Sequence, residues 1–208
     1  MARISIIGSG NMARAIGSRA VATGNTVEII GRSPDKATAL ARLLGGGTTT
    51  GTWGTRPTGD IVILAVLFAG AVPVVRDFGE ALAGKIVVDI TNPFTPDATG
   101  LAVPADTSVA MQIAEAAPAS IHVIKAFNTL FSNVLAAGDP VDVFMAGDDP
   151  GAKQSLSDFI TSLGLRPRDA GDLSMAHWLE SASLLEMGLA RTGLGFNIAL
   201  AVDTRAAA

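Results

Sequence analysis

The chain has 208 residues, a formal net charge of −4, 49% hydrophobic and 16% charged residues, and neither cysteine nor tyrosine. This is the composition of a folded globular chain, long enough for one α/β domain with a small appendage and too short for two full-sized domains of about 150 residues. It excludes disulfides, thiolate nucleophiles, cysteine-based zinc sites and a tyrosine proton donor, and the acidic balance without a run of Lys or Arg argues against nucleic acid as a partner.

Short runs rich in Val and Ile alternate along the chain with Ala-rich segments that favour helix. Strands are predicted at residues 3–7, 26–30, 60–66, 85–90, 121–125, 141–146 and 165–169. Helices are predicted at residues 11–23, 34–44, 71–78, 109–117, 152–163 and about 174–191, and loops at 45–50 and 91–103. The alternation predicts an α/β fold: a doubly wound parallel sheet of the Rossmann type with right-handed crossovers and a small C-terminal helical extension.

A glycine-rich turn follows the first predicted strand. Residues 8–13 read GSGNMA and fit the G-x-G-x-x-G/A fingerprint, in which the first glycine permits a tight turn and the second lets the backbone approach a pyrophosphate. The frequency of such matches carries no weight in a chain this rich in Gly and Ala, and a plain glycine turn is the alternative. The position between a strand and a helix N-terminus nevertheless favours dinucleotide binding. The residues expected on the pyrophosphate are Gly8, Ser9, Gly10, Asn11 and Met12.

The end of the second predicted strand carries cations where sites selective for NAD usually carry an acidic residue. Arg32, Ser33 and Lys36 follow this strand, whereas Glu28 lies within it and Asp35 lies beyond a proline. Two cations and a hydroxyl suit a 2′-phosphate, so the sequence favours NADP(H) over NAD. The alternative is a solvated loop with ordinary charges.

Three further strand ends are expected to form one pocket wall at the nicotinamide end. Ligands of a parallel sheet lie over the carboxyl ends of its strands. Asparagine side chains there can bind a carboxamide or the edge of an isoalloxazine-type ring, although turn chemistry explains Asn92 before Pro93 equally well, and Phe68 is expected in the core. The candidate residues are Ala65, Val66, Leu67, Asn92, Pro93, Ala126 and Asn128.

No acid and base pair stands out in the sequence. The two histidines, His122 and His177, have no metal-ligand spacing and are expected to be structural, and no G-x-S-x-G elbow supports a hydrolase. Hydride transfer between two bound cofactors needs no side-chain proton donor in principle, only ring atoms held about 3 to 3.5 Å apart with water excluded. We therefore predict no metal and no dedicated catalytic side chain.

At this point the chain resembles the NADPH-dependent deazaflavin reductases, also called F-420-dependent NADP oxidoreductases, and the cytosolic domain of the six-transmembrane metalloreductases. The segments that carry the resemblance are residues 7–13, 31–36, 89–93, 125–129, 146–149 and 165–173. The resemblance implies NADP(H) at the glycine turn and at Arg32, Ser33 and Lys36, direct hydride transfer to a deazaflavin (coenzyme F-420) or a flavin (FMN or FAD) stacked on the nicotinamide, and a homodimer.

The chain departs from the deazaflavin enzymes in the second-cofactor pocket. The deazaflavin enzymes that the chain resembles have a histidine at the position of Asn128. They also have a Trp-Glu-His-like stretch where residues 68–70 of this chain read Phe-Ala-Gly. The identity of the hydride acceptor therefore stays open between deazaflavin and flavin.

Two other functions remain as alternatives. One is an NADPH-dependent reductase of a small carbonyl or imine, but such enzymes add a large helical domain with a catalytic lysine, and no lysine follows Asp172 here. The other is a non-catalytic NADP-binding protein. We expect residues 1–125 to form the NADP-binding core and residues 126–208 to pack with it as one unit. The strand-like N-terminus and the 15-residue uncharged stretch 61–75, which contains Pro73, predict a cytoplasmic protein that does not contact the membrane.

Overall fold

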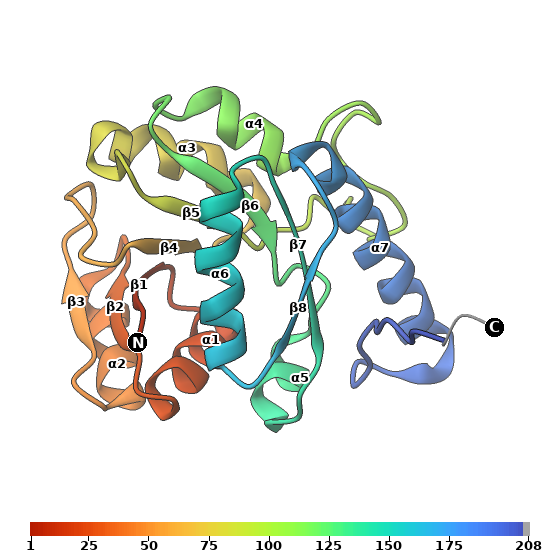
Figure 1. Cartoon of the computed structure of the whole chain (residues 1–208), viewed down its shortest axis with the longest axis horizontal. Coiled ribbons are helices and arrows are strands. Elements are labelled where there is room, and N and C mark those ends of the chain that lie inside the picture. The colour runs from red at the N-terminus through yellow and green to blue at the C-terminus, as the bar shows by residue number, and fades with distance from the viewer. Residues whose placement is uncertain (206–208) are drawn as a thin grey trace.

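The computed structural model describes residues 1–205 as an α/β fold around one eight-stranded sheet (Figure 1). The strands are β1 (Arg3–Ile7), β2 (Thr26–Ile30), β3 (Thr49–Gly51), β4 (Ile61–Leu64), β5 (Ile86–Asp89), β6 (His122–Ala126), β7 (Asp142–Gly147) and β8 (Arg166–Asp169). The helices are α1 (Asn11–Ala22), α2 (Pro34–Leu44), α3 (Phe68–Phe78), α4 (Val109–Ala116), α5 (Ser132–Ala137), α6 (Pro150–Ser162) and α7 (Ala176–Leu189). The strand order β3-β2-β1-β4-β5-β6-β7-β8 confirms the predicted doubly wound Rossmann-type fold.

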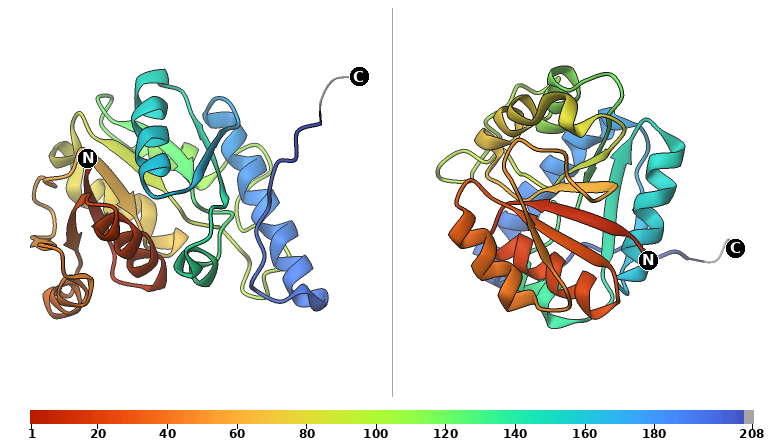
Figure 2. Two further views of the ribbon diagram at one scale, coloured as in Figure 1. Left: turned by 60° about the horizontal axis from the view of Figure 1, so that its bottom comes forward. Right: turned by 90° about the vertical axis from the view of Figure 1, so that its left-hand side faces the viewer.

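Helices cover both faces of the sheet, as the two views of Figure 2 show. One apolar cluster packs α1, α2, α5 and α6 against one face, and a second cluster packs α3, α4 and the start of α7 against the other. Successive residues of a strand point to opposite faces, so Ile6 lies in the first cluster and Ile7 in the second. A sheet covered on both sides needs continuous apolar strands, which explains why β1, β2 and β4 lack simple apolar–polar alternation.

The strand register brings the carboxyl ends of five strands to one edge of the sheet. Ile7 at the end of β1 pairs with Ile30 and Leu64, Leu64 pairs with Asp89, and Asp89 pairs with Lys125. The segments that follow β1, β2, β4, β5 and β6 therefore start side by side. This is the edge at which ligands bind in open α/β sheets.

The pairing of β6 with β7 differs from the all-parallel sheet that we predicted. β7 runs antiparallel to β6, while β8 runs parallel to β7. A parallel crossover needs a helix that returns the chain to the opposite edge of the sheet. The segment between β6 and β7 contains only the short helix α5 (Ser132–Ala137), which packs against α1, so the chain re-enters the sheet from the carboxyl edge.

A second difference lies in the segment 45–50 that we predicted to be a loop. Its final residues enter β3, which pairs with β2 at the sheet edge. Glycines at 45–47 with positive φ angles make the turn before it, and three residues of pairing are too short to give a strand signal in the sequence.

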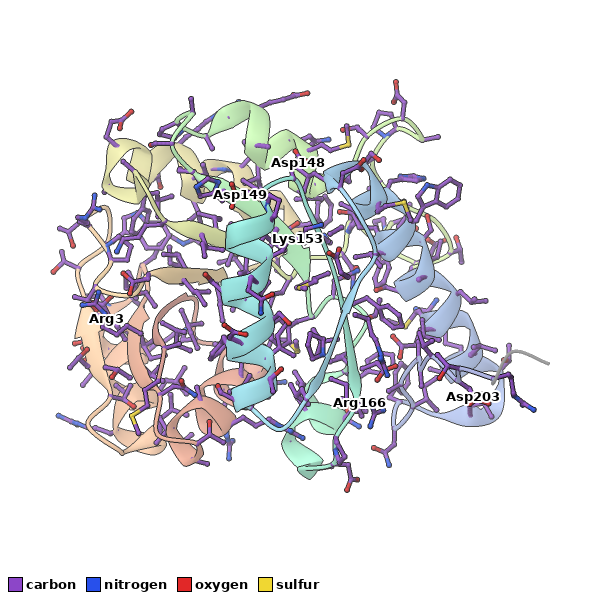
Figure 3. The ribbon with its side chains drawn as sticks, viewed as in Figure 1. Arg3, Asp148, Asp149, Lys153, Arg166 and Asp203 are labelled. Atoms are coloured by element: carbon purple, nitrogen blue, oxygen red, sulfur yellow. The ribbon has the colours of Figure 1, made fainter. Side chains whose placement is uncertain are left out.

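Ion pairs join β8 to α6 and to β7. Lys153 on α6 and Arg166 on β8 are labelled in Figure 3. Lys153 lies 2.9 Å from Asp169 at the end of β8, and Arg166 lies 2.6 Å from the buried Asp142 of β7. Burial opposes ionisation of Asp142, but hydrogen bonds from Arg168, the Val202 amide and Arg166 outweigh it and lower its pKa to about 2. Within residues 1–205, no helix has the length and apolar character that a membrane span requires.

Candidate nucleotide-binding site

A cavity of about 540 Å³ opens at the carboxyl edge, bounded by the segments after β1, β2, β3 and β4 and by α3. This volume is in the usual range for small-molecule sites, about 300–1,000 Å³. We call it the nucleotide cavity. Eight residues predicted from the sequence line it: Gly8, Ser9, Arg32, Ser33, Lys36, Ala65, Val66 and Leu67.

The first glycine of the fingerprint is required by the protein itself. Gly8 has a φ of +132°, a backbone conformation that residues with a side chain rarely adopt. A Cβ at this position would collide with the carbonyl oxygen of Ala65. The Gly8 amide donates a 2.8 Å hydrogen bond to the Ile30 carbonyl. Gly8 thereby joins the ends of β1, β2 and β4 in one tight turn under the cavity.

The second glycine has no such internal explanation. Gly10 is the N-cap of α1, has an ordinary φ of −86°, and a Cβ there would meet no atom within 4 Å. No side chain caps the helix, and its first turn, which begins with Asn11 and Met12, carries no acidic residue. The missing side chain leaves open space in front of a helix N-terminus, where amide groups and the helix dipole favour an anion. Gly10, Asn11 and Met12 do not line the cavity themselves but directly follow Ser9, which does.

Two cations stand at the end of β2 without anionic partners. Within residues 1–205, neither the Arg32 guanidinium nor the Lys36 ammonium forms an ion pair with a carboxylate. Ser33 is the N-cap of α2, and its hydroxyl accepts a hydrogen bond from the Lys36 amide at 3.5 Å. Part of the cavity wall is therefore positively charged and lies at a second helix N-terminus, that of α2.

The acidic residue of β2 is occupied elsewhere. Glu28 is buried; one carboxylate oxygen accepts hydrogen bonds from the Ser5 hydroxyl and, at 2.9 Å, from the Thr58 amide. It therefore does not reach the ribose position at the strand end, in agreement with its predicted place within the strand.

The sequence reasoning missed the part of the cavity wall that Trp53 and α3 form. Trp53, in the loop after β3, lines it together with Ala69, Gly70, Pro73, Val74 and Asp77 of α3. Residue 53 is remote from the fingerprint in the sequence and is brought to the cavity only by the pairing of β3 with β2. The sequence offers one indication of a role for this residue: it is one of two tryptophans in the chain, and it lies in a segment of Thr and Gly.

Asn92 and Asn128, predicted for the nicotinamide end, lie together but outside the cavity. The Asn92 amide donates to the Asn128 carbonyl oxygen at 2.8 Å, and the Asn128 amide donates to Asn92 Oδ1 at 3.0 Å and to the Leu179 carbonyl and Ser183 Oγ of α7. Both asparagines are thus joined at the ends of β5 and β6. Pro93 and Ala126, the other two predicted residues of this region, are buried.

The backbone turns sharply before Asn128. Phe127 is fully buried and has φ +59°, a left-handed conformation that costs a side-chain-bearing residue on the order of 1 kcal/mol. This turn directs Asn128 toward α7, which explains how a residue just past β6 reaches Leu179 and Ser183.

A fully buried lysine lies beneath the two asparagines. Lys125 of β6 places its ammonium 2.8 Å from Asp89 Oδ2 and 2.7 Å from Glu180 Oε1, and it also donates to the Thr91 carbonyl. Glu180 Oε1 in addition accepts from the Val109 amide at 3.0 Å. We call Asp89, Lys125 and Glu180 the buried lysine network. It ties β5 and β6 to α4 and α7 and was not foreseen from the sequence, because Glu180 arrives from a distant helix.

The same region contains buried polar atoms that lack hydrogen-bond partners within the described chain. They are Thr91 Oγ1, Asn128 Oδ1, Thr129 Oγ1, Glu180 Oε2 and Glu186 Oε1. Burial raises the pKa of Glu180 against the lowering effect of Lys125, and burial raises the pKa of Glu186 to about 7. The two sets of polar groups thus differ in solvent access. Arg32 and Lys36 in the nucleotide cavity are exposed, whereas the polar groups around Lys125 are buried.

The two histidines lie outside the cavity. His122 is at the exposed start of β6, with Nδ1 3.7 Å from an Asp149 oxygen, and His177 Nδ1 lies 2.9 Å from the Thr107 carbonyl oxygen. Phe68, expected in the core, is half-buried and packs against the cluster of α3 and α4.

The fold is that of the Rossmann-type α/β proteins, and comparison with known proteins narrows the class. Residues 3–93 match the family described as NADP oxidoreductase, coenzyme F420-dependent. The resemblance inferred from the sequence is thus confirmed, and it is carried by the part of the chain that holds the glycine turn and the cations after β2.

Two curated relatives agree with this result, and one solved structure shares the fold. Metalloreductase STEAP3 of Rattus norvegicus is 31% identical over 186 residues, which are 88% of this chain and 36% of that protein. The F420-dependent NADP reductase of Methanocaldococcus jannaschii is 32% identical over 139 residues, 63% of this chain and 62% of that protein. The chain therefore spans less than two thirds of either relative. A structure from Arthrobacter sp. FB24, described as a candidate F420-dependent NADP reductase, shares the fold with a TM-score of 0.85 at 23% identity, covering 98% of this chain and all of that one.

Proposed function

We propose that this chain is an NADP(H)-dependent oxidoreductase that binds the nucleotide in the nucleotide cavity and exchanges hydride with a deazaflavin (coenzyme F420) or a flavin (FMN or FAD). The observation that carries the proposal is the unpaired Arg32 and Lys36 in the same cavity as the Gly8 turn. Two cations that no carboxylate of residues 1–205 neutralises suit the 2′-phosphate that distinguishes NADP from NAD. The description of the matched family and the name of the Methanocaldococcus jannaschii relative support NADP as the nucleotide, and the names of both curated relatives support a reductase.

The residues of the glycine turn have a defined task in this proposal. The amides after Ser9, at the N-terminus of α1, would hold the pyrophosphate, and Gly10 would let it approach because no Cβ stands in its way. Ala65, Val66 and Leu67 line the cavity where it passes the end of β4 and would guide the nucleotide toward β5 and β6.

Asn92, Pro93, Ala126 and Asn128 are proposed for the nicotinamide and the ring stacked on it. Asn128 is buried and has committed both amide hydrogens to Asn92 and α7, so its task would be to hold Asn92 in place. Asn92 is the half-exposed member of the pair. When bound, NADPH would supply the hydride that reduces the acceptor ring. The chain's own residues would orient the rings and exclude water.

Nucleotide selectivity tests the first half of the proposal. Arg32→Ala should weaken NADPH binding by roughly one to two orders of magnitude and change NADH binding little, as measured by calorimetry. Arg42→Ala is the matched control, because Arg42 is an exposed arginine in the last turn of the same helix α2 and does not line the cavity. Equal losses for NADPH and NADH, or no binding of either nucleotide to the unaltered protein, would refute the assignment.

Turnover tests the second half. Oxidation of NADPH, followed by its near-ultraviolet absorbance, should be stimulated by coenzyme F420, FMN or FAD. Tight NADPH binding without turnover on any of the three would instead favour a non-catalytic NADP-binding protein. Turnover only with small carbonyls or imines would favour the alternative reductase.

A further inference from the structure

Trp53 occupies a defined position in the wall of the nucleotide cavity. Its indole N–H donates to Asp77 Oδ2 at 3.3 Å, and its ring packs edge to face on Phe78, with centroids 5.2 Å apart and planes at 71°. The loop residue is thus held against the C-terminal half of α3 by two contacts, although it is only half-buried.

The cavity wall combines two kinds of chemistry. Arg32, Ser33 and Lys36 make one part of the lining cationic, whereas Trp53 and Val74, with Asp77 also in the lining, make another part flat and apolar. A molecule that fits both parts carries an anion and a flat ring a short distance apart. An adenosine 2′-phosphate has this arrangement.

Asp77 adds a polar group beside Trp53. One of its oxygens accepts from the indole, and within the described residues the other, Oδ1, accepts no hydrogen bond. A carboxylate oxygen can accept only, so it pairs with an exocyclic amine and repels a ring carbonyl at the same position. Adenine carries an amine there, and hypoxanthine carries a carbonyl.

We propose that Trp53 and Asp77 form the adenine-recognition part of the cavity wall, Trp53 as the stacking surface and Asp77 as the acceptor for the exocyclic amine. This inference rests on the proposed function, because it assumes that the cavity binds NADP(H). Stacking of a base on an aromatic side chain is a general source of affinity in nucleotide recognition.

The two tryptophans of the chain provide a spectroscopic test. Trp178 is 62% exposed on α7 and does not line the cavity, so Trp178→Phe leaves Trp53 as the sole indole. Adenosine 2′,5′-bisphosphate, which has no nicotinamide, should quench the fluorescence of the Trp178→Phe variant and leave that of Trp53→Phe unchanged. Trp53→Ala should weaken the binding of adenosine 2′,5′-bisphosphate by roughly ten-fold, as measured by calorimetry. Quenching in Trp53→Phe but not in Trp178→Phe, or unaltered affinity of Trp53→Ala, would overturn the stacking assignment.

The acceptor role of Asp77 can be tested on the unaltered protein. NADPH should bind about ten-fold more tightly than its hypoxanthine analogue, because the analogue places a carbonyl against the carboxylate. Asp77→Asn should reduce this preference. Equal affinity for the two nucleotides would overturn the role of Asp77 while leaving NADP binding intact, whereas failure of the bisphosphate to bind at all would refute the proposed function itself.

Discussion

The nucleotide cavity and the buried lysine network lie at the same edge of the sheet, but their cations differ in exposure and in pairing. Arg32 and Lys36 are exposed to solvent and pair with no carboxylate in residues 1–205. Lys125 is 0% exposed and lies within 2.8 Å of two carboxylates. An exposed, unpaired cation is available to an incoming anion, whereas a buried cation has already committed its charge to the fold. Cations at this edge therefore indicate binding only where water still reaches them.

The largest effect that this comparison predicts comes from removing the buried cation. Lys125→Met would leave Asp89 and Glu180 as buried carboxylates without a counter-charge, so we expect a loss of about 3–5 kcal/mol in the free energy of unfolding, measured by urea denaturation. Lys153→Met is the control: it removes a lysine of the more exposed pair with Asp169, which contributes about 0–1 kcal/mol.

If the Lys125→Met variant does not fold, a double variant provides a second test of the network. Lys125→Met combined with Glu180→Gln removes one of the two unpaired charges and should recover part of the lost stability. A loss below about 1 kcal/mol in the single variant would contradict the structural role of the network.

The sequence predicted the Rossmann core well because its signals are local. Apolar strands, Ala-rich helices and the segment after β1 each occupy a few consecutive residues, and the cavity indeed brings together Gly8, Ser9, Arg32, Ser33 and Lys36. The antiparallel β7, the wall formed by Trp53 and the partners of Lys125 depend on contacts between residues far apart in the chain. Glu180 is 55 positions from Lys125, and no local pattern relates the two.

A second prediction concerns pH and again contrasts a buried group with an exposed one. Glu186 is 2% exposed, and burial raises its pKa to about 7. The unfolded chain therefore loses this proton at lower pH than the folded chain, and stability falls as the pH rises from the ordinary carboxyl range through 7.

Glu186→Gln should remove that fall. We expect the variant to match the unaltered protein near pH 4 and to exceed it by on the order of 1–3 kcal/mol near pH 8. Glu115→Gln, at an exposed position of α4, is the matched control and should give no pH-dependent difference. The same stability difference for Glu186→Gln at both pH values would show that burial does not hold the proton on Glu186.

The smallest expected change in stability is that of Gly10→Ala, a variant that distinguishes the role of the glycine turn in folding from its role in NADPH binding. An alanine Cβ at position 10 meets no atom within 4 Å, and the φ of −86° suits any residue, so Gly10→Ala should alter the free energy of unfolding by no more than about 1 kcal/mol. The same methyl group would stand where the proposed pyrophosphate approaches α1, so NADPH affinity should fall at least about ten-fold by calorimetry.

Gly8→Ala provides the contrast, because its Cβ would collide with the Ala65 carbonyl and require a strained φ of +132°. That variant should lose stability as well as affinity. If Gly10→Ala binds NADPH as tightly as the unaltered protein, the open space before α1 is not where the pyrophosphate lies.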